Sequence, residues 1–193
     1  MPRHFTVAAI LCACLILPGE AGARPLHYTL DPATSEVRFA IDLTQGGDIR
    51  GRMPVAAAAL TLDFEAAAQS RVQVTLDPAH ARTNLPFATQ AMKGPEVLDT
   101  GAHPQIRFES TRVRADGDGA IIDGQVTIRG VTRPITLAAR IYRPKGSAEG
   151  ARDQLTVHLT GTVRRSEFGA TGFPDFVGDE VRLDILARIR QDG

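Results

Sequence analysis

The side chains that could perform chemistry in this chain are few and widely spaced. Four histidines follow the N-terminal apolar segment, each far from the next and without a cysteine or a close carboxylate pair beside it: His27, His80, His103 and His158. Zinc ligands usually occur at recognisable short spacings. The sequence therefore predicts no metal site, and each histidine is expected to lie exposed on a strand or loop.

Serine and acidic residues give no stronger indication of catalysis. Ser166 is not part of a Gly-x-Ser-x-Gly turn and has no histidine near it in sequence, so a serine nucleophile is not supported. Asp175, Asp179 and Glu180 are expected to belong to a solvated loop. Glycosidase chemistry needs two carboxylates at a defined separation, which a sequence does not show. We predict no catalytic residue and no cofactor, and an enzyme is the least favoured class.

Charge also limits the choice of partner. The chain has 22 basic and 22 acidic residues, so its formal net charge is zero. A neutral chain creates no long-range field that would attract a phosphate backbone. Nucleic acid is therefore not an expected partner.

The N-terminal segment is typical of a secretory signal peptide. Arg3 precedes an apolar run of 13 residues, 5–17, and the small residues Ala21-Gly22-Ala23 follow. This run is too short to cross a bilayer core of ~30 Å as a helix. A lipoprotein site at Cys12 or Cys14 would leave an unusually short apolar segment. We expect residues 1–23 to be removed, residues 24–193 to form one domain without a disulfide, and the protein to be periplasmic.

The clearest structural pattern is a hairpin from Ala120 to Tyr142. Apolar and polar residues alternate along both halves, which is typical of half-buried strands. On the first strand the apolar face consists of Ile122, Gly124, Val126 and Ile128. On the second strand it consists of Ile135, Leu137, Ala139 and Ile141. Gly130 and Pro134 are expected to bound the connection at residues 131–133.

The same alternation recurs along most of the remaining chain. It predicts strands at 36–43, from Ile49, and at 60–64, 70–77, 106–108, 155–163 and 181–189. With the hairpin these make eight or nine strands. A helix stays open for the alanine-rich residues 55–59. Residues 84–93 read as one short helix with Asn84 as its cap, ending at Gly94. Such a chain is all-β with one short helical segment, and periodicity does not decide between a sandwich and a barrel.

Four segments resemble motifs of the YceI-like family. They are the hairpin Asp123–Ile135, the strand His103–Thr111, the run Arg165-Ser166-Glu167-Phe168-Gly169 and the run Val177-Gly178-Asp179-Glu180-Val181. They occur in the family's order. The resemblance implies an antiparallel lipocalin-like barrel of about eight strands, and a periplasmic protein that binds a long isoprenoid lipid in its apolar interior.

Inward aromatic and aliphatic residues could either fill a core or line a pocket, and the resemblance favours the pocket. The predicted ligand-binding residues are Phe39, Ile41, Phe64, Phe87, Met92, Ile106, Phe108, Ile128, Leu137 and Phe168.

The alternative is an accessory protein with a solid barrel, which contacts a membrane redox partner or a second copy of itself as a homodimer. The segment Phe173-Pro174-Asp175-Phe176 would then be a binding edge or a lid.

Overall fold

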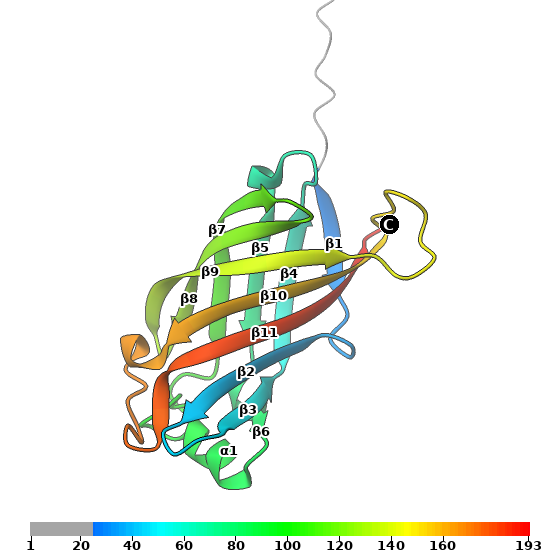
Figure 1. The fold of residues 1–193 in the computed structure, drawn as a ribbon. Helices are drawn as coiled ribbons and strands as arrows, with labels where there is room; N and C mark the ends of the chain where they lie inside the picture. Colours follow the sequence, from blue (N-terminus) through cyan, green and yellow to red (C-terminus); the bar gives the residue numbers. More distant parts are fainter. Residues whose placement is uncertain (1–24) are drawn as a thin grey trace, which may run out of the picture.

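The computed structural model describes residues 25–193, and the expected signal peptide lies outside them. Strands make up most of this region, and Figure 1 shows them wrapped around one long axis. The strands are β1 (Leu26–Leu30), β2 (Glu36–Leu43), β3 (Asp48–Met53), β4 (Val55–Leu62), β5 (Arg71–Leu76), β6 (Arg82–Thr83), β7 (Ile106–Asp116), β8 (Gly119–Ile128), β9 (Val131–Tyr142), β10 (Gln154–Arg164) and β11 (Val177–Gln191). The helical segments are α1 (Pro86–Lys93) and the 3₁₀ turns η1 (Ala67–Gln69), η2 (Pro78–His80) and η3 (Arg165–Phe168).

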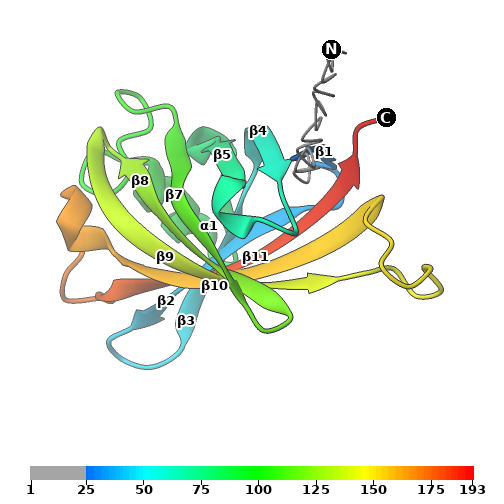
Figure 2. The same ribbon diagram turned by 90° about the horizontal axis from the view of Figure 1, so that it is seen from above.

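Eight of these strands form a closed ring. Their order is β1-β4-β5-β7-β8-β9-β10-β11, and β1 pairs with β11 to complete it, with Tyr28 opposite Gln191. All the pairings are antiparallel. Figure 2 looks along the axis and shows the strands curving around the interior. The expected lipocalin-like barrel of about eight strands is confirmed.

β1 and β4 are each joined along the chain to a strand outside the eight-strand ring: β2 follows β1, and β3 precedes β4. β2 pairs with the same edge of β11 as β1 does, after the interruption at residues 31–35. β3 leads into β4 through Pro54, and β6 pairs with β3. The wall therefore extends beyond the ring at the end where α1 lies (Figure 1).

The β8–β9 hairpin forms as expected, but its turn lies elsewhere. The chain reverses at Arg129-Gly130, and Val131 already belongs to β9. Both turn residues have positive φ, 52° and 74°, as a two-residue type I′ turn requires. Pro134 pairs with Gln125 inside the strand rather than bounding the turn. This position tolerates a missing N–H because β9 pairs with β10 only from Ala138 onward.

Two further local expectations are resolved by tertiary contacts. The alanine-rich residues 55–59 form part of β4 between β1 and β5, so they are strand rather than helix. The prediction that Asn84 caps α1 was wrong, because the N-cap residue is Leu85. Asn84 Oδ1 instead accepts a hydrogen bond from the Arg50 N–H at 3.0 Å, which ties the segment before α1 to β3.

Candidate functional site: an apolar cavity inside the barrel

The barrel encloses a cavity of about 690 Å³. This volume lies within the roughly 300–1,000 Å³ typical of small-molecule sites. The cavity extends along the barrel, since its walls include Phe64 after β4 at one end and Phe87 of α1 at the other. The interior of the barrel is therefore hollow rather than filled.

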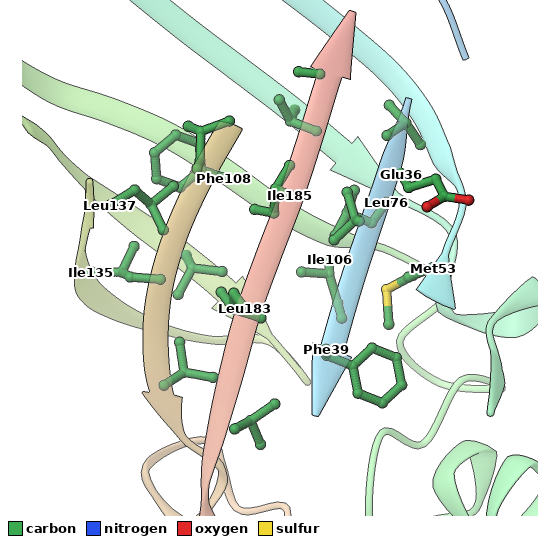
Figure 3. Close-up of a pocket in the computed structure, with 18 of the residues that line it drawn as sticks. Glu36, Phe39, Met53, Leu76, Ile106, Phe108, Ile135, Leu137, Leu183 and Ile185 are labelled. Atoms are coloured by element: carbon green, nitrogen blue, oxygen red, sulfur yellow. The ribbon is translucent and has the colours of Figure 1, made fainter. Parts of the chain in front are cut away.

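Alternate side chains of neighbouring strands form the cavity walls, as the period of a β-strand requires. In Figure 3, side chains from β2, β7, β9 and β11 surround the same space. They include Phe39, Ile106, Phe108, Ile135, Leu137, Leu183 and Ile185. An interior of this kind offers contact area to an apolar chain and few polar anchors.

Glycines in the wall help to explain why large side chains leave room inside. A Cβ at Gly51 would overlap the ring of Phe39, and one at Gly124 would overlap the ring of Phe108 and the carbonyl of Glu109. Both rings therefore occupy space beside the wall that a side chain would otherwise take. Because the rings rest on glycines, the aromatic residues line the interior without filling it.

All ten residues predicted to bind a ligand line this cavity: Phe39, Ile41, Phe64, Phe87, Met92, Ile106, Phe108, Ile128, Leu137 and Phe168. Their surroundings differ, because Phe87 is 70% exposed whereas Phe168 is 2% exposed and packs into the main core cluster. That these side chains contact a ligand stays a prediction.

The sequence-based set omitted several lining residues. Met53 lies on β3, and Leu183 and Ile185 lie on β11. The two β11 residues had a usable signal, because both fall on the apolar face of a predicted strand. Met53 had a similar signal, because Ile49, Gly51 and Met53 alternate with charged residues along the strand predicted to begin at Ile49. Phe173 and Phe176 also line the cavity, in keeping with the interpretation of their loop as a lid.

Arg165 is a basic residue on the cavity wall, and its guanidinium is already engaged by the backbone. Nε donates to the Gly178 carbonyl at 2.8 Å, and Nη1 donates to the carbonyls of Ala170 and Gly172 at 2.8 and 2.6 Å. Charged hydrogen bonds of this kind are stronger than neutral ones. Arg165 therefore holds together the segment between η3 and β11.

The acidic residues of this region also have structural partners. Asp179 Oδ1 accepts from the Ser166 N–H at 2.9 Å, and Ser166 Oγ donates to Asp179 Oδ2 at 2.8 Å. The hydrogen bond from the Ser166 backbone holds the pKa of Asp179 below its usual value. Ser166 thus has a carboxylate beside it, in an arrangement that stabilises the start of η3.

The histidines lie apart from one another. His80 Nδ1 is 2.6 Å from Asp77 Oδ2, and His158 Nε2 is 3.3 Å from Asp184 Oδ1, on separate elements. Within residues 25–193, no group of three or more His, Cys, Asp or Glu side chains is placed to hold a metal ion. In the same region, no helix has both the length and the apolar character needed to span a bilayer.

The fold and the cavity together define the class of protein: a lipocalin-like antiparallel β-barrel with a hollow, apolar interior. The family model described as the YceI-like domain matches residues 28–189, and the chain belongs to this family.

Curated relatives agree with this assignment. A UPF0312 protein of Pseudomonas paraeruginosa is 29% identical over 137 residues, covering 70% of this chain and 72% of the relative. Protein YceI of Escherichia coli O17:K52:H18 is 36% identical over 81 residues, 42% of each chain.

Two solved structures share the fold. Burkholderia cenocepacia BcnA aligns with a TM-score of 0.69 and 20% identity, over 83% of this chain and 99% of its own. A polyisoprenoid binding domain from Saccharophagus degradans aligns with a TM-score of 0.60 and 12% identity, over 86% and 99%.

Proposed function

We propose that this protein is an exported carrier that binds a long isoprenoid or similar amphiphilic lipid inside the barrel, without covalent chemistry. The observation that carries the proposal is the elongated cavity of about 690 Å³ with apolar walls. Burial of apolar surface contributes roughly 25 cal/mol per Å², so an apolar chain in this space would be held without specific polar contacts.

The comparisons support the same class of ligand. A structural neighbour from Saccharophagus degradans is described as a polyisoprenoid binding domain. The N-terminal segment of this chain supports export to the periplasm, where a carrier could move lipid between membranes. A solid accessory barrel fits less well, because the interior is hollow. Contacts with a membrane redox partner and a homodimer stay predictions.

Lipid extraction from protein made in its native source tests the proposal. The protein is purified without detergent, extracted with organic solvent, and its lipid is identified and quantified by mass spectrometry. We expect about one isoprenoid-type lipid per protein chain. Native-source protein that contains no stoichiometric lipid, and that takes up none when purified isoprenoid alcohols are added, would contradict the proposal.

A further inference from the structure

Three phenylalanines at one end of the barrel are exposed to solvent. Phe87 is 70% exposed, Phe173 is 44% exposed and Phe176 is 61% exposed. Tyr142 is the other large hydrophobic residue that is strongly exposed in the described part of the chain, and it lies at the far end of β9 (Figure 1). Most exposed apolar surface of this kind is thus gathered at one end, where it needs an explanation.

These three phenylalanines, here called the aromatic rim, also line the cavity, whereas Tyr142 does not. Phe87 lies on α1, and the other two lie on the segment between η3 and β11. Ala88, the residue after Phe87, and Val177, the residue after Phe176, belong to one packed cluster. The rim is therefore continuous with the interior, at the cavity's mouth.

The backbone between η3 and β11, which carries Phe173 and Phe176, accepts hydrogen bonds from other parts of the protein. Thr44 donates through its backbone N–H to the Phe176 carbonyl at 3.0 Å and through Oγ1 to the Asp175 carbonyl at 2.7 Å. With the bonds from Arg165 and within the turn, hydrogen bonds reach the carbonyls of Ala170, Gly172, Phe173, Asp175, Phe176, Val177 and Gly178. Carbonyls satisfied in this way enter an apolar medium at lower cost than free ones.

The size of the rim argues against a second copy as its occupant. With roughly 200 Å² for a whole phenylalanine side chain, the exposed fractions amount to about 350 Å². A stable protein interface buries about 800 Å² on each partner. A few phenylalanines on a rigid base instead suit shallow insertion at the boundary between lipid headgroups and acyl chains.

Charge around the rim indicates which kind of surface fits it. Lys93 lies on α1 with Phe87, Glu96 follows α1, and Asp175 lies between Phe173 and Phe176 in the chain, so both signs are present. Neither sign dominates, which removes the attraction that basic patches have for anionic lipids. The surface that fits is therefore one recognised by its apolar layer rather than by its charge.

We propose that the aromatic rim docks the mouth of the barrel onto a phospholipid bilayer. This inference rests on the proposed lipid-carrier function, because a docked mouth lets an apolar chain pass from the membrane to the cavity without crossing water. Binding depends on insertion of Phe87, Phe173 and Phe176, and it is insensitive to salt and to the fraction of anionic lipid.

Flotation with phosphatidylcholine vesicles tests the docking. The protein is recovered in soluble form from cells that express the full chain, and mass spectrometry defines its N-terminus. We expect wild-type protein to float with the vesicles equally at 0.1 and 0.5 M NaCl. Changing Phe87, Phe173 and Phe176 to serine lowers partitioning at least about tenfold, whereas the matched exposed-aromatic control Tyr142→Ser has no effect.

A fluorescent reporter makes the test independent of the triple variant's folding. The chain contains no tryptophan, so Phe176→Trp places a single indole on the rim and Tyr142→Trp places one at the far end. We expect vesicles to shift the emission of Phe176→Trp to the blue and to leave that of Tyr142→Trp unchanged.

The inference is overturned by wild-type protein that fails to float, by equal shifts at the two tryptophans, or by a stable dimer in solution that the triple variant dissociates. Its failure is distinguishable from that of the carrier function. Protein that contains extractable lipid but does not float contradicts docking alone, and protein that floats but contains no lipid contradicts the carrier function.

Discussion

The two ends of the barrel are built from different contacts. At the end where β1 closes the ring, Tyr28 and Leu155 are 3% and 2% exposed and pack in one cluster with Leu60 and Ile189. The Tyr28 hydroxyl donates to the Arg152 carbonyl at 2.8 Å, and its ring meets that of Phe64 edge to face, with centroids 6.2 Å apart. Burial raises the pKa of the Tyr28 phenol.

The opposite end keeps Phe87, Phe173 and Phe176 at the surface. Beside the packed cluster of Ile41, Ile49 and Ala88, this end is held by polar contacts to the backbone, chiefly those of Arg165 and Thr44. Apolar packing dominates at one end. At the other end, hydrogen bonds to the backbone hold the segment that carries the exposed Phe173 and Phe176. We therefore expect the proposed ligand to enter and leave at the α1 end.

The largest expected effect is at the packed end. Leu155→Ala should lower the free energy of unfolding by about 3 kcal/mol, since it removes a fully buried side chain from a filled cluster. Urea denaturation measures the change, and Leu155 does not line the cavity. A loss below about 1 kcal/mol would mean that this end is not tightly packed.

At the mouth, Arg165→Met should cost about 2 kcal/mol, because it keeps the apolar stem but leaves the carbonyls of Ala170, Gly172 and Gly178 without their donor. Limited proteolysis should then cut the segment between η3 and β11 earlier than in the wild type. An unchanged cleavage pattern would show that Thr44 holds the segment without Arg165.

Phe108→Ala tests the cavity wall between the two ends. A phenylalanine in a filled core costs ~3 to 5 kcal/mol on truncation, but Phe108 faces a cavity, so we expect a smaller loss. Denaturant titration with and without extracted lipid measures it. If lipid-loaded protein loses the full ~3 to 5 kcal/mol, and removing the lipid does not change this loss, Phe108 is not part of the ligand site.

Gly51→Ala should narrow the cavity, with a stability loss of about 1 kcal/mol. The new methyl group overlaps the ring of Phe39, which must move away from the wall. We expect weaker binding of the longest isoprenoid chains in a competition series of increasing length. Adding Phe39→Leu relieves the overlap and should restore binding, and equal affinity for all lengths in Gly51→Ala would argue against this account.

The smallest effect concerns pH at the mouth. The pKa of Asp179 is lowered in the folded protein, so its contribution is present above the unfolded value of about 3.9 and is lost as pH falls through the folded value. Asp179→Asn should therefore reduce stability slightly at pH 7, and less at pH 3. Parallel urea titrations at the two pH values check this, and a constant difference would exclude Asp179 as its source.

Local patterns predicted local structure well and turn details poorly. The alternation in β8 and β9 was confirmed, because it reflects which side of a strand each residue faces. The turn was predicted at the wrong residues because Arg129 has a positive φ, a conformation that arginine rarely adopts and that the sequence does not signal. The cap of α1 was misassigned because Asn84 bonds to β3, a partner 34 residues away.

The sequence by itself determined that this chain is a run of antiparallel strands with one short helix and that it resembles the YceI-like family. Strand alternation has a period of two residues, so a few neighbouring residues are enough to reveal it. Only the tertiary structure decided that β1 meets β11 to close the ring, that Gly51 and Gly124 leave space for aromatic rings, and that Phe87 shares one mouth with Phe173 and Phe176. These features depend on distances between segments far apart in the chain, which no local pattern records.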